Sequence, residues 1–425
     1  RGGVGETASG SGGSRMKWPT VPLKEIAPAQ TPNIRFSPDE PVWHLTLDQV
    51  ESHTGNIVNK KIAPTSAAGT STNVFDDGNV LYSKLRPYLN KVICPTEPGI
   101  ATTELVPLRP RKDLLDRRYL TYYLRSNHFL GFANVAVAGV KMPRIIMTKF
   151  WKHRIPLPPL SEQHRIVEIL DQADALRKRR AEADAKAARI LPALFYKMFG
   201  DPATNPRRWS VKKLGDPQVT TVNPKFSSAG VSDNTQFSFL PMADVDEVWG
   251  RIIGKQVRSY SDVARGFTSF QDNDVLFAKI TPCMQNGKAA IARNLVNGRG
   301  FGSTEFHVLR ASALSTPEWL YVLMRLPWFR KQAESSFTGT VGQQRVPTDF
   351  LANYTIGCPP IELQQKFAKA VLCFQEWVDQ TDRSRRCLEN IFSVLLHRAF
   401  TGDLTAKWRV AHMRELLAEM EAQAK

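Results

Sequence analysis

The sequence predicts an α+β fold in which two globular domains are joined by two long antiparallel coiled-coil helices, with a pseudo-two-fold internal repeat. Between Ile166 and Leu194, apolar residues recur at alternating steps of three and four, which is the pattern of a coiled-coil seam. The same spacing returns 201 residues later, between Phe367 and Leu395, and each run follows a globular segment of similar pattern. The chain is therefore predicted to be a duplicated unit of one globular domain and one long helix.

The first globular domain is assigned to residues 16–158. Residues 1–15 are rich in Gly and Ser and are interpreted as a flexible linker or tag outside the fold. Short runs of β-branched and aromatic residues predict strands, and an amphipathic pattern predicts one helix from Leu114 to Phe129. The predicted strands are Val42–Leu47, Val80–Tyr82, Lys91–Cys94 and Thr103–Leu108.

Residues 159–201 are predicted to form the first long helix, from Leu160 to Phe199. Two prolines, Pro158 and Pro159, end the preceding segment, and Ser161 is placed to cap the amino end of the helix. About forty residues at 1.5 Å each give a length of roughly 60 Å, which exceeds that of a helix inside an ordinary compact domain. The interior proline, Pro192, is expected to cause a kink only near the end of the helix.

The second globular domain, residues 202–358, repeats the layout of the first. It begins with a linker rich in Pro, Asn and Gly, FGDPATNPRRWS. Two early blocks align at an offset of 195 residues and two later blocks at 201, which indicates an insertion near Gly287–Arg299. The aligned blocks are 42–57 with 237–252, 75–91 with 270–286, 102–105 with 303–306, and, loosely, 136–145 with 337–346.

The second long helix is assigned to residues 359–402 and a short C-terminal tail helix to residues 403–425. If the two seams pair, the order of the chain requires the second helix to run antiparallel to the first. Small or polar residues occupy both seam centres, so packing is expected to be weakest there; they are Arg180, Ala183, Thr381 and Ser384. A molecule with two-fold pseudo-symmetry suits duplex DNA, whose strands present equivalent surfaces in opposite directions.

The charge of the chain is concentrated in the two globular domains. The net charge is +17, and residues 16–158 and 202–358 together carry +14 of it. This distribution favours two polyanion-binding faces over a generic solvated surface, which is the alternative. Five scattered cysteines without a CxxC pair, and the lack of a long apolar run or signal peptide, predict a cytoplasmic protein with no membrane association.

The residues show no catalytic constellation. The chain lacks a GxxxxGK[ST] phosphate-binding loop, an HExxH motif and Cys/His spacing for a metal. The sequence Asn223-Pro224-Lys225-Phe226 lacks the second proline of the [DNS]PP[YF] motif of amino-methyltransferases. We therefore expect a recognition module with no catalytic residue, no metal and no cofactor of its own. An enzyme with an unrecognised site and a scaffold that binds only protein remain alternatives.

Two regions are predicted to bind DNA, because Lys and Arg neutralise phosphates, Asn, Gln and Arg can bond base edges, and glycine lets the backbone approach closely. The first comprises Lys84, Arg86, Asn90 and Lys91, with counterparts Lys279, Gln285, Asn286 and Lys288. The second comprises Gly139, Lys141 and Arg144, with counterparts Thr338, Gly339, Thr340, Gln343, Gln344 and Arg345. A solvated strand-and-loop surface is the alternative for the first region.

Two further regions are weaker candidates. The block Thr102–Glu104 with its counterpart Ser303–Glu305 is as consistent with a hydrogen-bond network at a strand end as with DNA binding. The run Arg177–Arg180 lies on a near-neutral helix and is interpreted as a solvated or partner-facing patch.

Several motifs resemble one known family. PLPPLSEQHRIVEIL, ILPALFYKMFGDP, CPPIELQQKFAKAV and AFTGDL resemble the helical regions of specificity (S) subunits of bacterial type I restriction–modification enzymes, known as HsdS. FDDGNVLYSKLRPYL and GTVGQQRV resemble their target-recognition domains. The resemblance covers about residues 17–405, and the motifs occur in the right order and twice.

The resemblance implies a non-catalytic subunit whose two target-recognition domains each bind one part of a bipartite double-stranded DNA site. The helices would set the spacing of the two parts and hold two methyltransferase (M) subunits, which bind S-adenosylmethionine and methylate adenine. The resemblance also allows two restriction (R) subunits that use ATP and Mg. It implies a role in phage defence but indicates neither the target sequence nor the individual base contacts.

Overall fold

The computed structural model describes residues 18–423 except residues 70, 255 and 341. The predicted linker at residues 1–15 lies outside these described residues. The chain divides into two compact units. Unit 1 contains the described residues up to Lys178 and from Arg386 onward, and unit 2 contains Arg179–Arg385.

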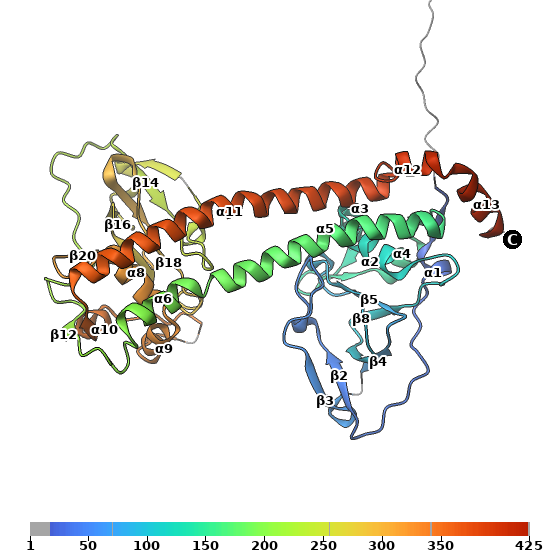
Figure 1. Cartoon of the computed structure of the whole chain (residues 1–425), viewed down its shortest axis with the longest axis horizontal. Helices are drawn as coiled ribbons and strands as arrows, with labels where there is room; N and C mark the ends of the chain where they lie inside the picture. Colours follow the sequence, from blue (N-terminus) through green and yellow to red (C-terminus); the bar gives the residue numbers. More distant parts are fainter. Residues whose placement is uncertain (1–17, 70, 255, 341, 424–425) are drawn as a thin grey trace, which may run out of the picture. The chain divides into compact units, whose positions relative to one another are not determined.

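The two larger sheets of unit 1 are accompanied by the strand pairs β1-β11 and β9-β10 and by helices that pack on one of the larger sheets (Figure 1). One sheet has the order β3-β2-β7-β4, in which β2 and β7 are parallel, and the other has the order β6-β5-β8. Helix α2 packs on β5 and β6. The elements before the long helix are β1 Thr20–Pro22, α1 Leu23–Ile26, β2 Pro41–Leu45, η1 Leu47–Gln49, β3 Lys61–Pro64, η2 Thr65–Ala67, β4 Thr72–Phe75, β5 Val80–Ser83, η3 Pro87–Leu89, β6 Val92–Ile93, β7 Gly99–Thr102, β8 Leu105–Leu108, α2 Arg117–Arg125, α3 Asn127–Val135, β9 Val137–Ala138, β10 Arg144–Ile145, α4 Met147–Lys152 and β11 Arg154–Pro156.

The four strands predicted for this region are confirmed as β2, β5, β6 and β8, with shifts of one or two residues at their ends. The single helix predicted for Leu114–Phe129 is wrong, because the chain forms α2 and α3 with a break at Ser126. The backbone of Ser126 is extended, with φ −66° and ψ 151°, and its hydroxyl accepts a hydrogen bond from the Phe129 amide. A residue that competes in this way for backbone hydrogen bonds ends one helix and caps the next.

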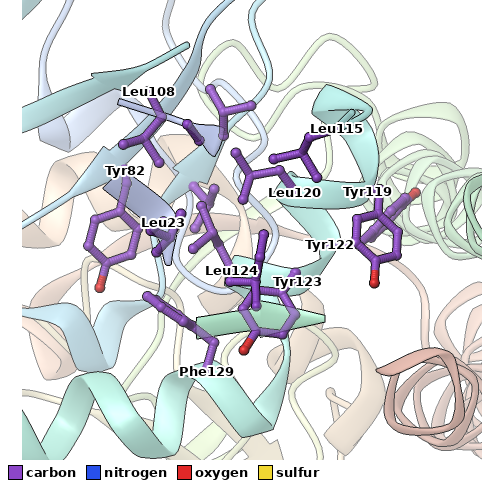
Figure 2. Close-up of a cluster of buried hydrophobic side chains, with 14 of the residues drawn as sticks. Leu23, Tyr82, Leu108, Leu115, Tyr119, Leu120, Tyr122, Tyr123, Leu124 and Phe129 are labelled. Carbon is purple, nitrogen blue, oxygen red and sulfur yellow. The ribbon is translucent and has the colours of Figure 1, made fainter. Parts of the chain in front are cut away.

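The largest core of unit 1 lies between the sheet strands and α2, and aromatic side chains fill much of it (Figure 2). Tyr82 from β5 stacks on Phe150 of α4 with ring centroids 5.0 Å apart. Burial of each such ring stabilises the fold by roughly 1.5–3 kcal/mol. Residues from both long helices belong to the same core, so the helix ends are part of the folded unit; they include Ile166, Leu170, Leu396 and Ala399.

Unit 2 repeats this architecture (Figure 1). The sheet β15-β14-β19-β16 corresponds to β3-β2-β7-β4, with β14 and β19 parallel, and the sheet β13-β20-β17-β18 contains the counterparts of β8, β5 and β6. Its elements are β12 Ser210–Lys213, β13 Thr220–Val222, β14 Gln236–Leu240, η4 Met242–Asp244, β15 Gln256–Ser259, α7 Tyr260–Val263, β16 Thr268–Gln271, β17 Val275–Ala278, β18 Ala289–Ile291, η5 Val296–Gly298, β19 Arg299–Gly302, β20 Phe306–Ala311, α8 Pro317–Arg325, α9 Pro327–Ser335, α10 Thr348–Asn353 and β21 Thr355–Cys358. The internal repeat predicted from the two offsets is thus present in the pairing of the strands.

The long helical segments differ from the prediction in continuity. The segment 159–201 contains two helices, α5 Leu160–Ala187 and α6 Ile190–Phe199, separated by a turn at residues 188–189. Pro192 is the physical reason, because a proline has no amide hydrogen and its ring clashes with the carbonyl four residues earlier, that of Ala188. The segment 359–402 is one helix, α11 Ile361–Thr401. The tail 403–425 contains two short helices, α12 Ala406–Ala411 and α13 Met413–Gln423, rather than one.

Within each unit, segments of the two long helices pack antiparallel. In unit 1, Ile166 shares a core with Leu396 and Ala399, while Arg177 reaches Glu389, 2.7 Å away. In unit 2, Ala187 clusters with Val378, and Phe199 packs against Phe367 with ring centroids 5.1 Å apart. In both units, a later position on the first helix meets an earlier position on the second.

The predicted seam is wrong in its middle part. Leu176 is 52% exposed and Ile391 is 47% exposed, although both were predicted to face the partner helix. Charged side chains lie between the helices instead. Each of them forms an ion pair with a side chain of the other helix. Arg177 pairs with Glu389 in unit 1, and Asp184 accepts a hydrogen bond of 2.8 Å from Arg385 in unit 2. In each unit, the helix contact nearest the unit boundary is therefore ionic, which a pattern of apolar residues does not reveal.

Two buried glutamines join the helices to the globular segments by the same contacts. Gln163 on α5 donates to the carbonyls of Leu114 and Pro158 and accepts from the Asp116 amide. Gln364 on α11 makes the equivalent contacts in unit 2, with the carbonyls of Leu314 and Pro359 and the Thr316 amide. Ser161, predicted as a cap, instead donates its amide and hydroxyl to the carboxylate of Glu419.

None of the helices in the described part of the chain is long and apolar enough to cross a membrane.

Candidate nucleic-acid interface

An exposed hairpin in unit 1 carries the second predicted DNA-binding region. Strand β9 pairs with β10, so that Ala138 lies opposite Arg144. Gly139 begins the connecting loop with φ +90°, a conformation that residues with a side chain rarely adopt. The side chain of Val140 at the tip is 99% exposed. The hairpin therefore presents its loop, with Lys141, to solvent.

Backbone hydrogen bonds attach this hairpin to the end of β5. The Arg86 amide donates to the Pro143 carbonyl at 2.7 Å, and the Ile145 amide donates to the Lys84 carbonyl at 2.9 Å. The Lys84 amide in turn donates to the carbonyl of Glu104 at 3.0 Å. Three predicted regions, distant in the sequence, thus meet at one place.

A bidentate ion pair closes the assembly. Arg144 donates from Nη2 to Oε1 of Glu104 at 2.8 Å, and its Nε lies 3.1 and 3.2 Å from the two carboxylate oxygens. These hydrogen bonds raise the pKa of Arg144 above its ordinary value. Paired in this way, the guanidinium is held in one orientation while 44% of the Arg144 side chain stays exposed.

Unit 2 contains the same arrangement, at offsets between 195 and 201 residues. Thr338 and Arg345 exchange backbone hydrogen bonds of 3.0 and 2.9 Å, and Gly339 follows with φ +107°. The Val346 amide donates to the carbonyl of Lys279 at 2.9 Å, and the Lys279 amide donates to the carbonyl of Glu305 at 2.9 Å. This second hairpin presents Thr340 and Gln343 to solvent.

The corresponding ion pair joins Arg345 to Glu305. Arg345 donates from Nη2 to Oε1 at 2.8 Å and from Nε to Oε2 at 2.9 Å, and its Nη1 donates to the carbonyl of Gln343 at 3.0 Å. The hydrogen bonds from Arg345 lower the pKa of Glu305 below its ordinary value of 4.5. Because the pair recurs at the same position of both units, it is a feature of the duplicated fold.

Some predicted residues have other roles. Asn90 is buried and donates to the carbonyl of Arg125 at 2.9 Å, so the prediction that it reads bases is corrected: its amide holds the turn after η3. Lys91 donates to the Leu47 carbonyl at 2.6 Å, and its equivalent Lys288 donates to the Met242 carbonyl at 3.3 Å. Each lysine therefore stabilises a short helix of its own unit, η1 for Lys91 and η4 for Lys288.

The other predicted residues lie elsewhere on unit 2 or on the helices. Gln285 pairs with Glu334 at 2.5 Å and Asn286 with Glu247 at 3.2 Å, near each other but beside α9 rather than on the hairpin. Gln344 lies in the hairpin, where its carbonyl accepts from the Thr281 amide. In the run Arg177–Arg180, the first and last arginines form ion pairs with carboxylates of the helices.

The sequence analysis named the blocks that contain Glu104 and Glu305 as a hydrogen-bond network or a DNA-binding region, but it did not predict that these residues pair with Arg144 and Arg345. Their blocks align at an offset of 201, and so do Arg144 and Arg345. This shared offset is the signal that could have linked the two pairs before the structure was known. Among the described residues, no group of three or more His, Cys, Asp or Glu side chains is placed to hold a metal ion.

Comparison with known proteins finds similarity to type I restriction specificity subunits. Residues 17–183 match the model of the type I restriction modification DNA specificity domain. The chain is 30% identical over 231 residues to the EcoEI specificity subunit of Escherichia coli, covering 52% of this chain and 38% of that protein. It is 33% identical over 216 residues to the EcoAI specificity subunit of Escherichia coli, covering 48% and 36%. The chain thus spans little more than a third of the length of these two curated relatives.

Solved structures share the fold. A type I restriction–modification S subunit from M. genitalium aligns over 91% of this chain and 97% of its own length, with 12% identity and a TM-score of 0.50. A chain from a structural study of complex assembly and conformational transition of the type I R-M system aligns over 92% and 99%, with 20% identity and a TM-score of 0.52. The solved structures thus show that the chain shares their fold, and residues 17–183 match a DNA specificity domain of type I restriction–modification systems.

Proposed function

We propose that this chain is the non-catalytic DNA-sequence-specificity subunit of a type I restriction–modification complex. Each unit binds one part of a bipartite double-stranded DNA site through its own hairpin. The match of residues 17–183 to a DNA specificity domain supports this function, as does the concentration of positive charge in both globular segments.

The observation that carries the proposal is the duplicated hairpin. In each unit a loop with a glycine at positive φ, and with exposed polar or basic residues, is fastened at its base by an Arg–Glu pair. Such a loop can enter the major groove of DNA, because that groove admits a two-stranded β-ribbon and the loop offers donors and acceptors to base edges. Nearby lysines such as Lys84 and Lys141 supply contacts to phosphates, which position the protein but carry no sequence information.

The helices have a second role in this proposal. They set the spacing between the two parts of the DNA site and dock two methyltransferase subunits, and optionally two restriction subunits. The chemistry then belongs to these partners, which bind S-adenosylmethionine in the first case and ATP with Mg in the second. Apolar side chains exposed on the helices, such as Leu176 and Ile391, are available for such docking.

Methylome sequencing tests the proposal. Cells that express the chain with its methyltransferase partner should carry one bipartite methylated motif, and cells with the partner alone should not. The purified chain should bind duplex DNA with an affinity that falls as salt rises, because phosphate contacts release counterions. Methyl transfer or DNA cleavage by the purified chain alone would refute the non-catalytic role, and a motif unchanged by its deletion would refute the specificity role.

A further inference from the structure

The Arg–Glu pairs leave a defined set of donors unused. A guanidinium has five N–H groups. In unit 2, hydrogen bonds within the described chain occupy three of those of Arg345: Nε and one Nη2 hydrogen on Glu305, and one Nη1 hydrogen on the Gln343 carbonyl. One hydrogen on each terminal nitrogen remains. In unit 1, Nε and Nη2 of Arg144 are likewise held by Glu104, and the outer edge of the guanidinium is again left over.

This remaining edge matches one base. Two parallel N–H groups on the terminal nitrogens of arginine complement the O6 and N7 acceptors of guanine in the major groove. Adenine presents an acceptor beside a donor, so that it can accept only one of the two hydrogen bonds. An arginine held rigidly at its other edge therefore discriminates guanine more sharply than a mobile one, because its orientation is set before binding.

Charge argues against simple phosphate binding at the same position. Each arginine is neutralised by the glutamate that it contacts, so the pair as a whole adds little to attraction by the DNA backbone. A glutamate carboxylate beside the DNA backbone would repel its phosphates. The Arg–Glu pair is therefore poorly suited to sequence-independent DNA binding. Unpaired lysines such as Lys141 are better suited to that task.

We propose that Arg144 and Arg345 each read a guanine, one in each part of the DNA site, and that Glu104 and Glu305 are positioning residues that hold these arginines in the reading orientation. This inference rests on the proposed function. It adds a constraint on the target: each part of the bipartite motif contains at least one G·C pair that depends on one named Arg–Glu pair.

The test compares the methylated motif of the wild-type complex with those of single variants. R345K keeps the positive charge but cannot make two parallel hydrogen bonds, and E305Q removes the charged acceptor while nearly preserving shape. Both should relax one G·C position in one part of the motif, with a loss of discrimination of about 5- to 150-fold, the range for a good bidentate contact. R144K and E104Q should relax one position in the other part.

A matched pair serves as control. Arg111 and Asp113 form an exposed ion pair of 2.9 Å on unit 1, in the loop that follows β8. R111K and D113N should leave the motif unchanged. E305D provides a further check, because the shorter side chain keeps its negative charge and should restore part of the discrimination lost in E305Q. If the defect were purely structural, the loss of discrimination in each variant would instead parallel its loss of thermal stability.

The outcomes separate the two proposals. A wild-type motif with no G·C pair in one part, a motif unchanged in R345K and E305Q, or uniform weakening across all sequences would each overturn guanine reading while leaving the specificity role intact. Failure of the wild-type chain to direct any motif would overturn the proposed function itself. Relaxation of a single position in the expected part would support both.

Discussion

The ion pair between Asp184 and Arg385 in unit 2 offers a direct test of the ionic helix seam. Asp184 accepts hydrogen bonds from Arg385 at 2.8 Å and from Arg180, and its side chain is only 13% exposed. Burial by itself would raise the pKa of Asp184, but these hydrogen bonds outweigh it and lower the pKa below its ordinary value of 3.8. The carboxylate is therefore charged and paired at neutral pH.

Removing this carboxylate leaves two arginines without their shared acceptor. Exposed ion pairs contribute about 0.2–1 kcal/mol, whereas breaking a fully buried pair costs about 3–5 kcal/mol. Asp184 is mostly buried and Arg385 is partly exposed, so we expect D184A to destabilise the local helix pair by about 2 kcal/mol. Part of this loss should disappear in the D184A/R385A background, because Arg385, which also pairs with Asp382 at 2.7 Å, is then no longer left with an unsatisfied Nε.

Hydrogen exchange is the suitable assay, because a chain of two units need not unfold in a single transition. Amides of α5 from Arg180 to Ala187 should exchange roughly 30-fold faster in D184A, the factor that corresponds to about 2 kcal/mol. E168A is the matched control, since Glu168 forms an exposed pair with Arg165 on the same helix. Equal effects of D184A and E168A, or full additivity in the double variant, would refute an energetically coupled ionic seam.

Three further predictions follow from other parts of the structure. Q364A should destabilise unit 2 by roughly 2–4 kcal/mol, because it leaves buried backbone groups unpaired, and Q163A should destabilise unit 1 for the same reason. Urea unfolding followed separately in each unit measures this effect, and destabilisation of the other unit would contradict the prediction. The pKa of Glu305 is lowered in the folded state, so its contribution to stability is present above pH 4.5 and is lost as pH falls below that value; the stability curves of wild type and E305Q should converge in acid. Four residues inserted after Ala183 and after Ser384 should lengthen the helices by about 6 Å, at 1.5 Å per residue. The gap of the methylated motif should then widen by about two base pairs of roughly 3.4 Å each. A folded, active variant with an unchanged gap would exclude the spacing role.

Strands and the internal repeat could be predicted from the sequence because both depend on local patterns. Runs such as Val80–Tyr82 alternate or cluster apolar residues in a way that only a buried strand needs. The blocks that repeat at offsets of 195 and 201 fall on equivalent strands of the two units. Local composition and spacing thus carry most of the architecture.

The features that escaped prediction depend on particular side-chain partners. The apolar spacing placed Leu176 and Ile391 in the seam, but the charged pairs Arg177–Glu389 and Asp184–Arg385 occupy it. A heptad pattern predicts only apolar residues at the helix contact. A charged residue is expected to be exposed unless its partner of opposite charge is known. The pairing of Arg144 with Glu104 was hidden for the same reason, since forty residues separate them in the chain.

The breaks within helices show a different limit. Pro192 was expected to kink the first helix near its end, but the interruption falls at residues 188–189, one turn earlier, because the proline excludes the carbonyl that precedes it by four residues. Ser126 similarly divides a region of continuous helical periodicity. Periodicity reports which face of a helix is buried but is insensitive to a single residue that ends it.

The two glutamine anchors affect how freely this protein can change its sequence. Gln163 and Gln364 hold each globular segment mainly through main-chain groups: the carbonyls of Leu114 and Leu314 and the amides of Asp116 and Thr316. Main-chain groups are the same whatever amino acid occupies a position. Exposed side chains of the globular segment can therefore be replaced without breaking these particular hydrogen bonds. A connection of this kind allows the exposed residues of the globular segment, and hence its binding specificity, to change during evolution while these hydrogen bonds to the helices stay the same.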